Sequence, residues 1–240
     1  YDDMTGHGTA IAGIIAGSGK GSNGKYRGIA PDTFLVSVKV LDKSGNGKIE
    51  NVVEAAGWII ENKSAMNIRV VNISFGTRAK MENGPAIETG EDDYALIMAV
   101  EKMWDSGIVV VAAAGNNGPG NASVTAPGIS KKIITVGAFD DKNFFSGRGP
   151  TRECIVKPEV VVTGSNIIAC NNRQGRYSSK SGTSMAAPVV SGAVARLIKN
   201  NPDITPKEVK IWMKSCCKKI NVPSEKQGWG VLDIRKFVTG

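Results

Sequence analysis

Histidine is almost absent from this sequence. The 240 residues include one histidine, His7, which excludes a metal site built on several imidazoles. Cysteine is scarce as well, and its four positions form no CxxC pair, so the sequence predicts no metal site of the Cys/His type. We expect free, partly buried thiols, which slightly favour a cytoplasmic location over the alternative, secretion. The cysteines are Cys154, Cys170, Cys216 and Cys217.

Long hydrophobic runs are absent too. No apolar stretch reaches the roughly 18 residues that a membrane-spanning helix needs, so we expect no membrane partner. The net charge is +8, and residues 171–240 carry 13 Lys/Arg against 4 Asp/Glu. These basic residues are scattered at helical positions without interleaved aromatics, which is typical of a solvated face. We therefore expect no nucleic-acid partner, and the sequence gives no indication of an oligomeric state.

What the sequence does contain is a regular alternation of strand and helix patterns. Chain length and a hydrophobic fraction of 41% predict one domain over residues 1–240. The alternation predicts an α/β fold: a three-layer sandwich with a mostly parallel central sheet flanked by helices. A capping-box pattern, TPKE, predicts the start of the last helix at Thr205. The expected strands are 34–40, 68–75, 108–115 and 133–139; the expected helices are 8–17, 50–63, 92–106 and a stretch after Pro188.

Two loops resemble ligand-binding motifs in part. Residues 19–25 fit both GxxxxGK and GxGxxG, but no strand precedes them and no helix follows, as phosphate loops require. The turn that begins at Asp42 resembles the start of a calcium loop, yet Val53 stands where the bidentate acid should be. Both are predicted to be ordinary surface turns.

Three residues could together support nucleophilic catalysis by serine. Ser184 lies in SGTSMAAP, where a glycine turn meets a helix, and its alternative role is a helix N-cap. His7, in GHGT, is the only imidazole that could take the serine proton; its alternative role is structural. Asn116 follows VVVAAAGN at a strand end, where an amide could donate to an oxyanion or simply form a turn.

In this order the motifs resemble the subtilisin-like serine proteases, the subtilases. The matching stretches are GHGTAIAG, VVNISFG, AAAGN and SGTSMAAP, with support from YRGIAP, VKVLDKSGNG and QGWGVLD along essentially the whole chain. The resemblance implies a serine endopeptidase that acts through an acyl-enzyme. In it, His7 is the general base, Ser184 the nucleophile and Asn116 an oxyanion donor, with the Ser184 N–H as the second donor.

The resemblance also implies which residues bind an extended polypeptide substrate. Residues 45–47 would pair with its backbone, while 74–76 and 113–115 would form opposite walls of the main specificity pocket. No carboxylate stands in these walls, so we expect a neutral or apolar residue before the scissile bond. The residues are Gly45, Asn46, Gly47, Ser74, Phe75, Gly76, Ala113, Ala114 and Gly115.

One element of the family pattern is missing. Subtilases carry an aspartate on an earlier strand, in a stretch like VIDTG, and this sequence has none. Asp2 and Asp3 lie too close to His7 in sequence to reach the far ring nitrogen readily. We expect the catalytic aspartate upstream of Tyr1, on an N-terminal strand that the chain lacks. The 240 residues alone should then fold poorly. Their protease activity should be weak or absent, lower by about four orders of magnitude, which is the loss established for removal of the aspartate from subtilisin itself.

Other interpretations stay open. Calcium is possible through the resemblance only, because loop 17–28 lacks the calcium pattern of some subtilases, and no other cofactor is evident. A catalytically impaired pseudoprotease that binds peptides is the main alternative function. An α/β-hydrolase is disfavoured because its elbow needs GxSxG, whereas Ala186 holds the last position, and because its histidine should follow the serine.

Overall fold

The computed structural model describes residues 3–77, 90–173 and 177–240. At its centre is a six-stranded sheet with the order β1-β2-β3-β4-β8-β7. The first five strands in this order run parallel, and β7 pairs antiparallel with β8. A separate antiparallel pair is formed by β5 and β6. The strands are β1 (Val70–Ile73), β2 (Val109–Ala113), β3 (Ile134–Ala138), β4 (Val160–Val162), β5 (Ile167–Cys170), β6 (Tyr177–Lys180), β7 (Cys217–Lys218) and β8 (Val231–Leu232).

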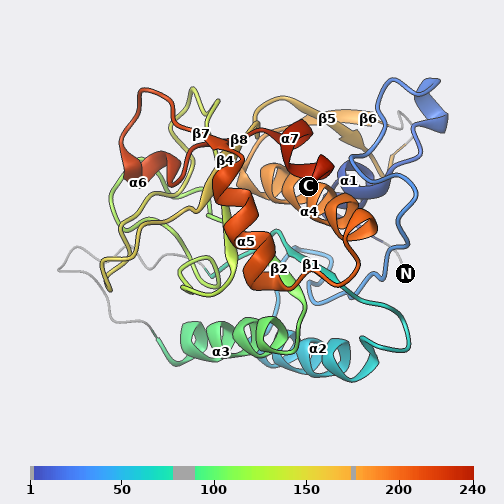
Figure 1. Ribbon diagram of the computed structural model, residues 1–240. Helices are drawn as coiled ribbons and strands as arrows, with labels where there is room; N and C mark the ends of the chain where they lie inside the picture. Colours follow the sequence, from blue (N-terminus) through green and yellow to red (C-terminus); the bar gives the residue numbers. More distant parts are fainter. Residues whose placement is uncertain (1–2, 78–89, 174–176) are drawn as a thin grey trace.

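Helices cover both faces of the sheet, as the sequence predicts (Figure 1). The side chains of β2 alternate between two cores: Val109, Val111 and Ala113 share a cluster with α1 and α4, while Val110 and Ala112 face α2 and α3. All five residues of β2 are buried, which is typical of a strand inside a parallel sheet. The helices are α1 (His7–Ala16), α2 (Ile49–Asn62), α3 (Glu91–Asp105), α4 (Thr183–Asn200), α5 (Pro206–Ser215), α6 (Ser224–Gln227) and α7 (Ile234–Thr239), with a 3₁₀ turn η1 (Lys20–Ser22).

Helix α4 runs through the middle of the larger core, and thirteen of its residues are buried. It begins at Thr183, just after the glycine turn, and Pro188 lies inside the helix. A proline has no N–H and cannot donate to the carbonyl four residues earlier, which is that of Ser184. The helix therefore carries one backbone acceptor in its first turn that it cannot satisfy itself.

Two expectations about secondary structure are wrong. Residues 34–40 form no strand, and Phe34 is fully exposed. A strand needs a partner for its backbone hydrogen bonds, and no described strand pairs with this segment. The helix at Thr205 does begin with the expected capping box, but it is not the last, because α6 and α7 follow it.

Candidate active site

His7 is the first residue of α1, and its position is set by the turn before it. Gly6 adopts a left-handed conformation (φ 68°) that favours glycine. The Asp3 carboxylate accepts hydrogen bonds from the Gly6 N–H (2.9 Å) and from the N–H and hydroxyl of Thr9 (2.7 and 2.8 Å). Asp3 thus ties together the first turn of the helix that carries the imidazole.

The same contacts show what Asp3 does not do. Burial raises the pKa of Asp3, but hydrogen bonds from Thr9, Thr5 and Gly6 together outweigh it and lower the pKa below its usual value. Its oxygens are thus engaged with the helix start. Among the residues that the structure describes, no carboxylate is hydrogen-bonded to the His7 ring, so the expectation of an upstream aspartate stays a prediction.

His7 and Ser184 meet at one backbone oxygen. The His7 Nε2 lies 2.9 Å from the Ser74 carbonyl oxygen, and the Ser184 hydroxyl donates to the same oxygen at 2.9 Å. The two side-chain atoms are therefore separated by no more than twice that distance. Ser184 is the second residue of α4, not its N-cap, which is Gly182.

The contact with Ser74 also bears on the tautomer of His7. A carbonyl oxygen can only accept, so this contact is a hydrogen bond only when Nε2 carries the hydrogen. A general base for Ser184 needs a free lone pair at that nitrogen. The structure therefore shows the two side chains brought together at one carbonyl oxygen, and acceptance of the serine proton requires the tautomer with the hydrogen on Nδ1.

Asn116 is held beside Ser184 by the preceding residue, Thr183. Its Oδ1 accepts from the Thr183 N–H (3.0 Å) and hydroxyl (3.1 Å), and the Thr183 hydroxyl in turn accepts from the Gly115 N–H (3.1 Å). With Oδ1 occupied, the Nδ2 group remains as a donor. It lies next to Gly182, where an added Cβ would come within 3.3 Å of it. The Ser184 N–H, in the first turn of α4, has no acceptor within the helix.

The two expected pocket walls are neighbours because β1 and β2 are adjacent parallel strands, with Ile73 paired to Ala112. Residues 74–76 and 113–115 thus leave the sheet at the same edge, where sites gather in such folds. Ala113, Ala114 and Ser74 are buried, whereas Gly76 is exposed. The Phe75 side chain packs against the clusters beneath α2 and α3.

Sequence reasoning missed Thr125, which lies between these walls. A Cβ added to Gly76 would come within 2.5 Å of the Thr125 hydroxyl oxygen, and one added to Gly115 within 2.7 Å. The Thr125 N–H donates to the Ala114 carbonyl (3.2 Å), which fixes its loop against the second wall. No local motif marks this threonine, and only the folded arrangement of three segments reveals it.

Residues 45–47 lie in an exposed turn. Its shape comes from Asp42, whose carboxylate accepts from the N–H groups of Ser44 (2.8 Å) and Asn46 (3.0 Å). These two hydrogen bonds, that of Asn46 being the stronger influence, lower the pKa of Asp42. A Cβ added to Gly45 would lie 3.9 Å from the Thr5 side chain, so the turn is close to the residues that lead into His7. The pairing of Gly45, Asn46 and Gly47 with substrate stays a prediction.

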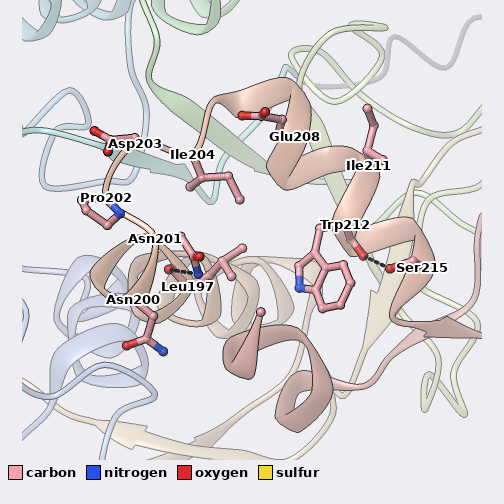
Figure 2. A pocket seen from close by; sticks show the side chains of 11 residues that line it. Leu197, Asn200, Asn201, Pro202, Asp203, Ile204, Glu208, Ile211, Trp212 and Ser215 are labelled. Atoms are coloured by element: carbon pink, nitrogen blue, oxygen red, sulfur yellow. Dashed lines mark hydrogen bonds between the residues drawn. The ribbon is translucent and has the colours of Figure 1, made fainter.

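Other candidate sites offer little. Within the described ranges, no three His, Cys, Asp or Glu side chains are grouped to hold a metal, and the calcium expectation stays untested. The four cysteines are free, and none of the described helices is long and apolar enough to cross a membrane. Figure 2 shows a separate pocket between the end of α4 and α5, lined by Leu197, Ile204 and Trp212 among others. It includes none of the predicted site residues.

The sequence is similar to those of known serine proteases. A model of the subtilase family matches residues 1–230. Serine protease AprX of Bacillus subtilis is 40% identical over 90% of this chain, which spans 53% of that protein. Subtilisin DY of Bacillus licheniformis is 33% identical over 87% of the chain and 69% of its own length. The Minor extracellular protease Epr of Bacillus subtilis is 29% identical over the whole chain and 34% of its own length.

Solved structures show the same fold. Sphericase superimposes with a TM-score of 0.80 at 25% identity, over 96% of this chain and 78% of its own. A cold-adapted subtilisin-like serine proteinase gives 0.74 at 29% identity, over 96% of this chain and 74% of its own. The chain spans about half the length of AprX, and a relative named as extracellular gives no support to a cytoplasmic location. On the family match, the relatives and the fold together, the chain belongs to the subtilase family of subtilisin-like serine proteases.

Proposed function

We propose that the protein is a serine endopeptidase that cleaves polypeptides through an acyl-enzyme. Ser184 is the nucleophile, His7 the general base, and the oxyanion donors are the Asn116 Nδ2 and the Ser184 N–H. One observation carries this proposal: the Ser184 hydroxyl and the His7 ring converge on the Ser74 carbonyl, while Asn116 is bonded to the residue before Ser184. Base, nucleophile and amide donor thus share one edge of the sheet.

The chemistry follows from these positions. The Ser184 oxygen attacks the scissile carbonyl carbon as His7 Nε2 takes the serine proton. The carbonyl oxygen becomes an oxyanion, which the Asn116 amide and the Ser184 N–H stabilise. His7 then gives its proton to the leaving amine, and the acyl group remains on Ser184. A water molecule, deprotonated by the same imidazole, hydrolyses the ester and regenerates the serine.

For the first step, Nε2 must be free to accept and the ring hydrogen must be on Nδ1. A carboxylate beside Nδ1 favours that tautomer, because it accepts the Nδ1–H and stabilises the imidazolium that forms. We assign this role to an aspartate on residues that precede Tyr1 in the whole protein. The exposed apolar segment 34–38 supports the assignment, since a strand that brings the aspartate could also cover these side chains. Without it, the 240 residues alone should be weak or inactive.

Substrate preference follows from the pocket walls. The walls at 74–76 and 113–115 carry no charge, and Thr125 adds a small neutral side chain between them. A neutral or apolar side chain therefore suits the residue before the scissile bond. In this proposal the Thr125 methyl and hydroxyl limit how large that side chain can be.

The test is digestion of a peptide library by the purified whole protein, with cleavage sites mapped by mass spectrometry. Internal cleavage after neutral or apolar residues is expected, and a strong preference for Lys or Arg would overturn the specificity. The Ser184→Ala variant serves as the control for contaminating proteases. Peptide binding without cleavage, in a protein shown to be folded, would instead identify a pseudoprotease.

A further inference from the structure

A series of side-chain hydrogen bonds joins the interior of α4 to the nucleophile by way of β1. The Ser191 hydroxyl donates to Asn72 Oδ1 (2.9 Å), and Asn72 Nδ2 donates to the Ser74 hydroxyl oxygen (2.9 Å). The Ser74 hydroxyl then donates to the backbone carbonyl of Ser184 (2.9 Å). We call these four residues the Ser191–Ser184 relay. It leaves α4 at one turn, crosses to β1, and returns to the first turn of the same helix.

The relay ends on a carbonyl that the helix cannot satisfy. In an α-helix this oxygen accepts from the N–H four residues later, and four residues after Ser184 is Pro188, which has none. A buried carbonyl left without a donor is costly. The Ser74 hydroxyl supplies the missing donor, and so it replaces a helix hydrogen bond at the residue that carries the nucleophile.

The direction of the hydrogen bonds in the relay decides whether the Ser74 hydroxyl can donate to the Ser184 carbonyl. Ser74 has one hydroxyl proton, and it reaches Ser184 only because the Asn72 NH₂ group, a donor, faces the Ser74 oxygen. If an acceptor faced Ser74 instead, the proton would turn to that acceptor and the Ser184 carbonyl would lose its partner. The Ser191 hydroxyl lies 2.9 Å from Asn72 Oδ1 and 3.1 Å from the Ala187 carbonyl oxygen, and when it donates to Oδ1, the shorter contact, it keeps the amide in the orientation that the relay needs.

We propose that Asn72 and Ser191 are positioning residues for the nucleophile, which orient the Ser74 hydroxyl and thereby fix the first turn of α4 between His7 and Asn116. Neither residue touches the reacting atoms. The inference rests on the proposed function, because it assigns the relay a role in the reactivity of Ser184. It predicts that disturbing the relay slows the chemical step and leaves reagent binding unchanged.

The test uses the whole protein and a fluorophosphonate probe, with kinact and KI measured separately. Asn72→Asp preserves the shape of the side chain but replaces the NH₂ donor by an acceptor, which draws the Ser74 proton away from Ser184. We expect kinact to fall about tenfold, the equivalent of one hydrogen bond, with KI unchanged. Ser191→Ala removes only the outer donor and should lower kinact by about threefold, while Ser191→Thr, which retains the hydroxyl, should restore it.

Ser130→Ala is the matched control. Ser130 is also a buried serine, but its hydroxyl donates to Glu101 (2.7 Å) on α3, away from the relay. This variant should lose stability in urea unfolding and keep the wild-type kinact. An equal fall in kinact would show that general destabilisation, not positioning, is responsible.

The possible failures are distinguishable. If the wild-type protein is not labelled at Ser184, the proposed function is wrong and the relay has no catalytic role. If the wild type is labelled and both relay variants fold and react at the wild-type rate, the relay inference alone is overturned. Should Asn72→Asp not fold, the pair Ser191→Ala and Ser191→Thr decides the question.

Discussion

Helices α1 and α4 each place one reactive side chain in their first turn, but they do so by different means. The helix start that carries His7 is held by its immediate neighbours, because the Asp3 carboxylate binds residues no more than six positions away. The imidazole itself also contacts the Ser74 carbonyl, 67 residues away. Ser184 depends on distant segments: its contacts with Ser74 span 110 residues, and those of Thr183 with Asn116 span 67. The helix start at His7 is thus encoded locally, whereas both reactive side chains reach Ser74 only once the sheet has formed.

The largest effect should come from removing either reactive side chain, His7 or Ser184. If His7 and Ser184 act as one unit, His7→Ala and Ser184→Ala should each lower kcat by about 10⁶, the value established for subtilisin, and the double variant should lose little more. Peptide hydrolysis by the whole protein measures this. Losses that multiply in the double variant would show that the two ends act independently.

Asn116→Ala should have the next largest effect. Removing one oxyanion donor typically lowers kcat by about 10²–10³, and KM should change little because the donor acts mainly in the transition state. Asn116 also accepts from Thr183, so α4 loses one of its long-range ties as well. Urea unfolding separates the two contributions; a loss seen in KM alone would contradict an oxyanion role.

A smaller effect distinguishes local capping at the active site from capping elsewhere. Asp3→Ala and Thr205→Ala each remove a helix-start acceptor and should each cost about 1 kcal/mol of stability. Only Asp3→Ala should lower kcat, by roughly fivefold, since a shift of about 1 kcal/mol in the His7 turn acts on the reaction. The measurement pairs urea unfolding with kcat for both variants. Equal kcat values would remove Asp3 from the positioning of His7.

An effect on stability and not on activity concerns the core, remote from both ends. Burial lowers the pKa of Lys157 to about 8 from 10.5, although its Nζ donates to both oxygens of Glu159. Between these values the unfolded chain binds more protons than the folded one, so this group makes the free energy of unfolding rise with pH. The wild type should therefore gain stability relative to Lys157→Met as pH rises from about 8 to 10.5. A constant difference in urea unfolding across that range would refute the shift.

Features that neighbouring residues encode could be predicted from the sequence, whereas features that depend on distant segments could not. The GHGT turn, the capping box at Thr205 and the buried run of β2 are local patterns, and each lies where it was expected. The segment 34–40 has the composition of a strand but no partner among the described residues, and a strand cannot form alone. Composition indicates that a segment prefers an extended conformation, whereas strand pairing depends on the rest of the sheet.

The site shows the same limit. Motifs identified Ser184, His7 and Asn116 as candidates, and the fold brings them to one edge of the sheet. Asn72 lies within VVNISFG, but that stretch indicates no role for it, and Thr125 carries no motif at all. Their importance comes from what faces them: the Ser74 hydroxyl for Asn72 and two glycines for Thr125. Such contacts arise from strand order and register, which cannot be read from a single sequence.

The most direct test of the account is where a fluorophosphonate attaches to the whole protein, and whether attachment needs His7. We expect one adduct, on Ser184 by peptide mapping, formed rapidly by the wild type and hardly at all by His7→Ala when both proteins are folded. An unlabelled Ser184 in the folded wild type, or labelling that is equally fast without the imidazole, would contradict it.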